Sequence, residues 1–476
     1  RDYAYAGSFY AFAIWIGLGV AAISDLLNKY VFKKQAIFGA VLSGLCLLVP
    51  VQMASQTWDD HDRSGRYTCR DFGQNYLNSL DEGKSPIIFT NGDNDTFPLW
   101  YCQETEGIRT DARVCNLSYL QTDWYIDQMK RPAYDSPAVP IAWKRLQYVT
   151  GTREGIHVRP GQLEYAIDLL KDDPEQMKEL LGENPYDLKN IIDKWILNEE
   201  ESMQCFPTDS VVITIDKEAV RRSGMMIAAD SIPDVMHISL KGKRAVYKNE
   251  MMIYEMLCRT NWERPMYVAC TVGSDNYGSL SNNFVREGLA DRITPFDTQK
   301  SGLTMDTERM YNNMMNKFRF GGLENEDLYL DETVLRMCYT HRRLFATLAM
   351  QLVREQKYDK AVEVLKYVEK VIPATTVPHN YMGGSMDMAR VWLSNGYKDE
   401  AEQIVLSIAQ TAREYLEWYA GLNINRQMGS KRDIMYNLYQ LNSAVEILTD
   451  SQSPEAKELE KMVQAFQMIF ADALYT

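Results

Sequence analysis

Two long uncharged stretches at the start of the chain constrain its fold more than any other feature. Residues 3–24 read YAYAGSFYAFAIWIGLGVAAIS and residues 35–58 read QAIFGAVLSGLCLLVPVQMASQTW, and neither contains a charged side chain. Each is long enough to cross a hydrocarbon layer of roughly 30 Å as a helix. A pair of buried core helices is the alternative interpretation. Because a short basic link joins the two stretches, we favour two transmembrane helices within residues 1–58.

The charges around these stretches predict an orientation. The link DLLNKYVFKKQ is rich in lysine, whereas the acidic sequence DDHD follows directly after Trp58. Basic residues concentrate on the cytoplasmic side of a membrane. We therefore expect a protein of the cytoplasmic (inner) membrane whose soluble part lies on the extracytoplasmic, periplasmic side. The chain does not begin with Met and no signal-peptide pattern precedes the first stretch, which suggests the end of a larger membrane domain.

Composition limits the remaining possibilities. The formal net charge of the 476 residues is -14, which argues against nucleic acid as a partner. The eight cysteines are scattered, without a CxxC pair or a zinc-binding spacing, and are best interpreted as buried free thiols. We expect no cofactor, with a divalent cation as the one alternative considered below.

Alternating strand and helix patterns predict an extracytoplasmic α/β domain over residues 59–330. SPIIFT and ARVCNLSYL have the composition of buried strands, and TFPLWYCQETEG and TDWYIDQMK that of the helices after them. This order favours a mostly parallel sheet covered by helices. Residues near 160–205 are polar and helical, as in an insertion. DSVVITID, VMHISLKGK and RPMYVACTVG then predict that the second half of the sheet comes from about residues 209–295.

Residues 331–476 predict an all-α domain of tetratricopeptide-like repeats. LFATLAMQLVREQKYDKAVEVLKYVEKVIP follows the small and apolar positions of a two-helix repeat, and MDMARVWLSNGYKDEAEQIVLSIA follows much of the same pattern. Stacked helical hairpins of this kind bury one another's apolar faces.

The first candidate site is the sequence Asp93-Asn94-Asp95, which follows a predicted strand. An Asp-x-Asp sequence at the end of a strand could hold Mg²⁺ or Mn²⁺ through carboxylate oxygens. The alternative is structural: Gly92 permits a turn, Asp95 or Thr96 caps the next helix, and Pro98 lies in its first turn. We favour the structural interpretation and predict no metal site.

The second candidate site follows the second uncharged stretch. Arginine side chains suit a phosphate-bearing lipid head group, and aspartate with histidine suits a cation. A solvated turn is the alternative. The candidate residues are Asp59, Asp60, His61, Asp62, Arg63 and Arg66. Trp124 in TDWYIDQMK is a further candidate, because aromatic rings stack on sugars, although such residues more often belong to a core.

Four segments together carry a family resemblance. They are RDYAYAGSFYAFAIWIGLGV, WDDHDRSGRYTCRDF, the long block NGDNDTFPLWYCQETEGIRTDARVCNLSYLQTDWYIDQMK, and NWERPMYVACTVGSDNYGSL. The chain resembles the C-terminal portion of the protein O-mannosyltransferase-like family of multi-pass membrane proteins, in which tetratricopeptide-like repeats can follow the membrane part. The resemblance implies a GT-C type fold for the full-length protein. It also implies a polyprenyl-phosphate sugar as donor and hydroxyl side chains of exported proteins as acceptors.

The resemblance assigns no catalytic residue to this chain. Enzymes of that type carry their catalytic acid in an early extracytoplasmic loop, whereas this chain resembles the portion that begins at the last two membrane helices. Two hypotheses follow. In the first, the chain is the part of a membrane glycosyltransferase that recognises acceptor proteins through its repeats. In the second, it is a non-catalytic membrane-anchored scaffold for envelope proteins.

Overall fold

The computed structural model describes residues 2–30, 35–226 and 232–475. The chain divides into two compact units, Arg1–Gly65 and Arg66–Thr476. Each unit is described by itself below.

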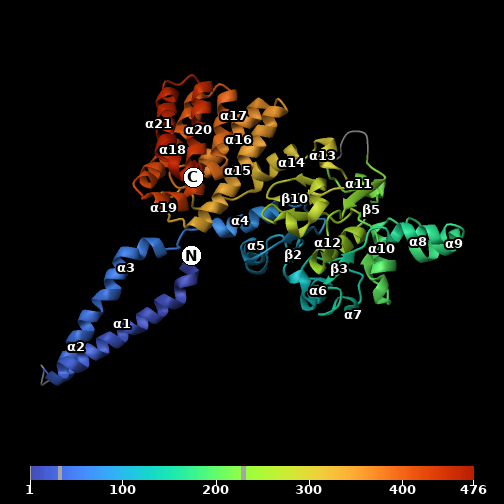
Figure 1. Cartoon of the computed structure of the whole chain (residues 1–476), viewed down its shortest axis with the longest axis horizontal. Coiled ribbons are helices and arrows are strands. Elements are labelled where there is room, and N and C mark those ends of the chain that lie inside the picture. The colour runs from blue at the N-terminus through green and yellow to red at the C-terminus, as the bar shows by residue number, and fades with distance from the viewer. Residues whose placement is uncertain (1, 31–34, 227–231, 476) are drawn as a thin grey trace. The chain divides into compact units, whose positions relative to one another are not determined.

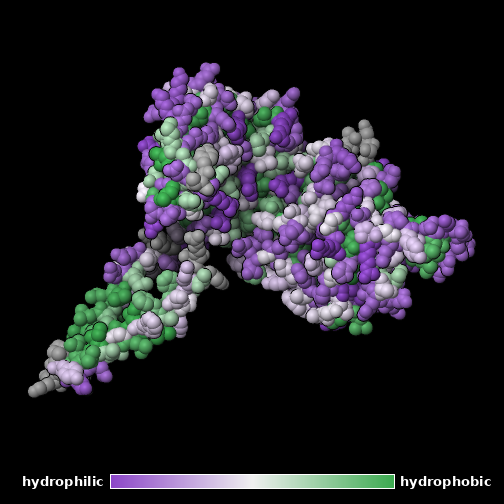
Figure 2. Space-filling view, in the orientation of Figure 1, coloured by the Kyte–Doolittle hydropathy of each residue, from purple (hydrophilic) through white to green (hydrophobic). Residues whose placement is uncertain are grey.

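The first unit consists of apolar helices. They are α1 (Asp2–Tyr30), α2 (Gln35–Cys46) and α3 (Leu48–His61). Two stretches, Ala4–Tyr30 and Gly39–Trp58, are helices long and apolar enough to cross a membrane by length and composition, which agrees with the two predicted segments. Hydrophobic residues cover much of the visible face of this unit (Figure 2). Two lysines of the predicted basic link, Lys33 and Lys34, lie outside the described residues.

A five-stranded mixed sheet forms the centre of the second unit. Its order is β2-β1-β8-β10-β9: β2, β1 and β8 run parallel, and β10 and β9 are antiparallel to their neighbours. The strands are β1 (Ile87–Thr90), β2 (Arg113–Asn116), β8 (Met266–Ala269), β9 (Phe284–Arg286) and β10 (Ala290–Ile293). All residues of β1, β2 and β8 are buried, as expected for strands covered on both faces. The predicted α/β class is confirmed.

Two helices pack closely beside this sheet, α4 (Thr68–Asn78) and α5 (Asp93–Glu106) (Figure 1). They approach each other at Gly73, where an added Cβ atom would lie 2.4 Å from the carbonyl oxygen of Pro98. Since that distance is shorter than any real Cβ contact, only glycine fits this position. The contact fixes α5 against α4 and thereby positions the residues at the start of α5.

Two smaller sheets differ from the sequence prediction. The strands β5 (Ser210–Thr214) and β6 (Val235–Ser239) pair with each other as an antiparallel ribbon, with one further bridge from Val212 to Asp187, and do not join the main sheet. Among the described residues of the predicted range 209–295, only β8, β10 and β9 belong to the main sheet. The error arose because an apolar strand pattern does not specify its pairing partner.

The helical insertion was expected near residues 160–205. Its helices are α8 (Gln162–Leu170), α9 (Pro174–Leu181) and α10 (Leu188–Ile191). Before and after it lie β3 (Gly155–Val158) and β4 (Cys205–Phe206), which pair in parallel through His157 and Cys205 and so close its base. A third strand, β7 (Ala245–Tyr247), completes this small sheet. Further helices are α6 (Asp123–Met129), α7 (Arg145–Tyr148), α11 (Lys217–Arg222), α12 (Lys248–Arg259), α13 (Thr298–Ser301) and α14 (Thr307–Asn312).

The C-terminal region is all-helical, as predicted. Its helices are α15 (Glu332–Arg354), α16 (Tyr358–Val371), α17 (Ser385–Ser394), α18 (Lys398–Ala420), α19 (Ile424–Gly429), α20 (Lys431–Asp450), α21 (Glu455–Ile469) and α22 (Ala471–Tyr475). Consecutive long helices pack as pairs, α15 with α16, α17 with α18, and α20 with α21 (Figure 1). This packing suits stacked hairpins, and the tetratricopeptide-like interpretation stays a prediction.

His341 on α15 lies where the helical region meets the α/β region. Its Nε2 lies 3.0 Å from the amide nitrogen of Asn75, and its Nδ1 lies 3.1 Å from the carbonyl oxygen of Met337. Edge-on contacts with Phe72, Phe318 and Phe320 enclose the ring. Burial lowers the pKa of His341 to about 4, so the imidazole is neutral at pH 7 and donates from Nδ1.

Candidate functional site

The three parallel strands of the main sheet end at one edge in polar residues. Thr90 ends β1, Asn116 ends β2, and Thr271 follows β8. β2 and β8 lie on opposite sides of β1, so the chain order of the strands reverses between β1 and β8. In open α/β sheets the carboxyl edge at such a reversal is the usual place for a ligand site.

Asp95 is the ionisable group of this edge. It is 7% exposed, and burial raises its pKa, while hydrogen bonds from the Thr271 hydroxyl and the Asn91 N–H favour the charged form. The Thr271 hydroxyl in turn lies 2.8 Å from the hydroxyl of Tyr76. The edge therefore places a carboxyl group, a hydroxyl group and a phenol within one hydrogen-bonded set.

A second set of hydrogen bonds fixes the loop that carries Asp95. Thr96 donates its hydroxyl proton to the carbonyl oxygen of Gly92 at 2.8 Å. It therefore accepts from the hydroxyl of Thr90 at 2.8 Å and from the amide of Asn116 at 2.9 Å. These bonds join the ends of β1 and β2 to the first turn of α5. The position of Asp95 is thus determined by the sheet.

The prediction that Asp95 or Thr96 caps the helix after Gly92 was wrong. The helix α5 begins at Asp93, with Gly92 as the N-cap residue at φ 85°, and no side chain caps it. Asp95 and Thr96 lie inside the first turns, and Pro98 follows in the second. The turn at Gly92 was anticipated correctly, since a positive φ favours glycine.

The helical geometry of α5 also separates the two carboxylates of Asp93-Asn94-Asp95, the sequence considered as a metal site. Asp93 and Asn94 are exposed, whereas Asp95 is buried. Residues two positions apart on a helix do not face each other. Among the described residues, no group of three or more His, Cys, Asp or Glu side chains could hold a metal ion.

Trp124 lies at the end of a row of aromatic rings. Phe97 stacks on Trp100 at 5.7 Å between ring centroids, Trp100 stacks on Tyr119 at 6.3 Å, and Tyr119 contacts Trp124 at 5.8 Å. Trp124 also contacts the ring of Tyr125 edge-on at 5.4 Å. Trp124 is 54% exposed, and it is available for stacking on a ligand.

Arg66 lines a cavity of about 780 Å³ beside α5. Arg70 and Arg319 also line it, together with Tyr67, Phe97, Tyr101 and Phe320. Arg66 donates to Asp331 at 2.9 Å, and Arg70 pairs with Glu106 at 2.7 Å. Asp71 and Glu106 line the cavity as well, so it combines paired guanidinium groups with exposed aromatic rings, a set typical of a membrane interface.

The other residues of the second candidate site belong to the first compact unit. The helix α3 extends to His61, whose Nδ1 lies 2.8 Å from the carbonyl oxygen of Thr57. Hydrogen bonds from the Ser64 hydroxyl and from the Ser64 N–H, the latter at 2.8 Å, lower the pKa of the Asp62 carboxyl group. Arg63 follows in the chain and is exposed. The side chains of Asp59 and Asp60 lie outside the described residues.

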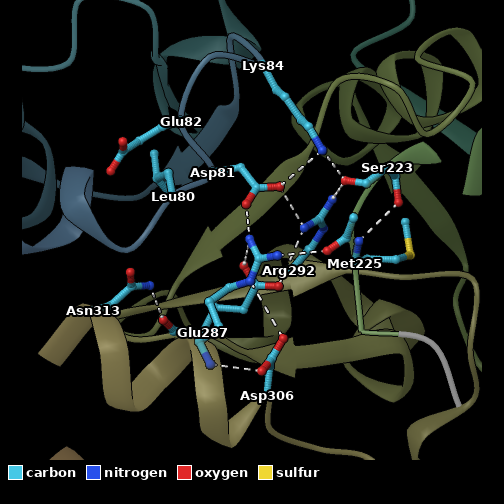
Figure 3. A network of polar contacts seen from close by, with 12 residues as sticks. Leu80, Asp81, Glu82, Lys84, Ser223, Met225, Glu287, Arg292, Asp306 and Asn313 are labelled. Carbon is cyan, nitrogen blue, oxygen red and sulfur yellow. Dashed lines mark hydrogen bonds and ion pairs between the residues drawn. The ribbon is translucent and has the colours of Figure 1, made fainter. Parts of the chain in front are cut away.

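A buried ionic network occupies the opposite edge of the sheet (Figure 3). Arg292 is fully buried and bonds to Asp81 at 2.9 Å, and Arg309 contacts the same carboxylate. Glu287 accepts the Tyr267 hydroxyl at 2.9 Å, and burial raises its pKa to about 7. The network ties the chain before β1 to β10 and α14. Its place at the amino ends of the parallel strands indicates a structural role.

The sequence analysis missed the residues that form this edge of the sheet together with Asp95. Tyr76, Asn116 and Thr271 were not candidates, although each buried strand ends in a polar residue, in IIFTN, RVCN and MYVACT. Polar residues at the ends of several parallel strands meet at one edge, and this signal was present in the sequence. Arg319 was also missed, because residues far apart in the sequence form that cavity.

A family model described as TMEM260-associated domain 2 matches residues 69–314, just over half of the chain. The chain belongs to this family. The match agrees in broad terms with the resemblance to protein O-mannosyltransferase-like proteins. It includes Asp95, Thr271 and Trp124, whereas Arg66 and Arg319 lie outside the matched range of the TMEM260-associated domain. No curated protein and no solved structure matches the chain.

Proposed function

We propose that this chain is part of a membrane glycosyltransferase of the protein O-mannosyltransferase-like type. The enzyme moves a sugar from a polyprenyl-phosphate donor to hydroxyl side chains of exported proteins. The match to TMEM260-associated domain 2 carries the proposal. The two apolar helices support an attachment to the cytoplasmic membrane. In this proposal the soluble unit lies on the periplasmic side.

The proposed role of this portion is to recognise the acceptor protein or a partner. Asp95, Thr271 and Tyr76 offer a carboxyl group and hydroxyl groups at the carboxyl edge of the sheet, a chemistry that suits hydrogen bonds to a sugar or a peptide. Trp124, on the helix α6 that follows β2, adds an exposed aromatic ring. We assign no catalytic role to these residues and no cofactor to the site.

Membrane lipid is the proposed partner of the cavity around Arg66. Only residues 59–65 separate Arg66 from the end of the second apolar stretch. Tyr67 and Tyr101 are about half exposed beside Arg66 and Arg319. Tyrosine and arginine are side chains that favour the membrane interface.

A non-catalytic scaffold is the second candidate function. It is favoured by a cavity of about 860 Å³ in the helical region, because stacked helical hairpins commonly bind polypeptides. In this case the chain would hold envelope proteins at the membrane without any chemistry of its own.

One reaction separates the two functions. Full-length protein in membrane vesicles is incubated with a radiolabelled polyprenyl-phosphate sugar and an exported acceptor protein. Transfer of label to the acceptor supports the glycosyltransferase. Capture of acceptor proteins without transfer to any of them supports the scaffold.

A further inference from the structure

The helix α17 is much shorter than the helices around it. It has 10 residues, whereas α15 and α18 have 23 each and α20 has 20. The helix α17 packs against all three of them. It begins beside the middle of α15, since an added Cβ atom on Gly384 would lie 3.0 Å from the Cα atom of Arg343. The first halves of α15 and α20 and the second half of α18 therefore extend beyond the start of α17.

This difference in length leaves a cavity of about 860 Å³. Its walls come from the parts of the three long helices that have no α17 beside them. Its end is the turn before α17, where Tyr381 contacts Tyr436 and Tyr439 edge-on at 6.0 and 5.5 Å. The lining residues that matter for binding are Tyr339, Tyr415, Tyr419, Tyr436, Asn437 and Gln440.

The cavity contains buried polar groups with unused hydrogen-bonding capacity. The hydroxyl of Tyr436 is buried and has no hydrogen-bond partner among the described residues. Gln440 and Asn437 are each 6% exposed, and Gln440 donates to Asn437 at 3.3 Å. Asn437 also donates to the carbonyl oxygen of Asp433 at 2.9 Å. Since an amide nitrogen carries two protons, each of the two amides can still donate one more hydrogen bond. A buried hydroxyl without a partner is costly, and a polar ligand would supply the missing partner of Tyr436.

The chemistry of the lining distinguishes between kinds of ligand. A helical ligand satisfies its own backbone and would leave the Tyr436 hydroxyl and the amides unpaired. An extended polypeptide presents free N–H and C=O groups along its length, and its side chains can pack on Tyr339 and Tyr415. The charged residues of the lining balance, with Glu332 and Asp433 against Arg336 and Arg343. This balance favours an uncharged segment.

We propose that the cavity between α15, α18 and α20 binds an extended, uncharged polypeptide segment. The backbone of the segment hydrogen-bonds to Tyr436, Asn437 and Gln440, and its side chains contact the exposed ring of Tyr415 and the half-buried ring of Tyr339. The identification of this segment as a hydroxyl-rich part of an exported acceptor rests on the proposed function. The binding geometry itself does not.

The test measures binding without any transfer reaction. A short fluorescein-labelled peptide of Ser, Thr and Ala is titrated with the full chain in detergent, and fluorescence anisotropy gives Kd. Tyr415→Ala removes a ring that is 54% exposed and should weaken binding about tenfold. Tyr436→Phe removes only the unpartnered hydroxyl and should weaken binding about fivefold without loss of stability. Tyr165→Ala, a 67% exposed tyrosine on α8, is the matched control and should leave Kd unchanged.

Two results would overturn the proposal. The first is peptide binding that neither Tyr415→Ala nor Tyr436→Phe weakens. The second is that the chain does not bind the peptide and binds maltohexaose tightly instead. That result would identify the cavity as a sugar site. Peptide binding by this chain together with absence of sugar transfer by the full-length protein would uphold the cavity and refute the proposed enzyme.

Discussion

The contact between Gly73 and Pro98 gives the sharpest prediction about stability. In Gly73→Ala, the new methyl group would lie 2.4 Å from the Pro98 carbonyl oxygen and 2.9 Å from the Pro98 Cβ atom. Normal carbon–oxygen contacts need roughly 3.2 Å or more, so α4 and α5 must separate by almost an ångström. The obstacle is backbone and cannot rotate away.

The magnitude follows from two opposing effects. Overpacking in a well-packed core costs about 1–3 kcal/mol, and a backbone obstacle places this case near the upper value. Alanine is better than glycine in a helix by about 1 kcal/mol. We therefore expect a net destabilisation of about 2 kcal/mol. Since each 1.4 kcal/mol is about tenfold in an equilibrium constant, local opening should become about 30-fold more frequent.

Hydrogen exchange with mass spectrometry measures this opening in peptides from α4 and α5. Gly429→Ala is the matched control, because Gly429 is also helical and an added Cβ atom there has no neighbour within 4 Å. The control should leave exchange in α4 and α5 unchanged. Equal exchange in Gly73→Ala and wild type would refute the packing of α4 against α5.

Two further predictions concern ionisable groups. The pKa of His341 is about 4 in the folded chain and about 6.5 for an unperturbed histidine, so the folded state binds fewer protons between these pH values. The free energy of unfolding should fall by about 3 kcal/mol as the pH falls from 6.5 to 4. Urea unfolding at both pH values should show a smaller fall in the His341→Gln variant. An equal fall in the variant and the wild type would contradict the burial of this imidazole. Calorimetric titration with Mn²⁺ should show no binding that depends on Asp93, because Asp93 and Asp95 face different directions on α5. Tight Mn²⁺ binding that is lost in the Asp93→Asn variant would support a metal site at Asp93 after all.

Much of the α/β region was predictable because its signals are local. The apolar runs before Asn91 and in residues 113–116 have the length and composition of buried strands, and each became one. The start of α5 was placed wrongly by a few residues, since Asp95 and Thr96 have the chemistry of caps but Gly92 performs that role. Side-chain preference at a helix end is weak when hydrogen bonds from the sheet fix the turn.

The features that could not be predicted depend on pairing between distant segments. The patterns of β5 and β6 indicate strands, yet the separate ribbon they form depends on which neighbours are available. The cavity around Arg66 is lined in part by Arg319, which is distant in the sequence. The cavity of the helical region forms because the first half of α15 extends beyond the start of α17. Hydrophobic periodicity in the sequence predicts the helices, but the cavity of the helical region depends on their relative lengths.

The proposed sugar transfer is tested most directly on exported proteins from the cell. Mass spectrometry would compare exported proteins from cells that contain the full-length protein with those from cells that lack its gene. The proposal predicts hexose on serine or threonine residues of a defined set of proteins, lost on deletion and restored by the intact gene. Identical modification in both cells, with the same exported proteins present, would contradict it.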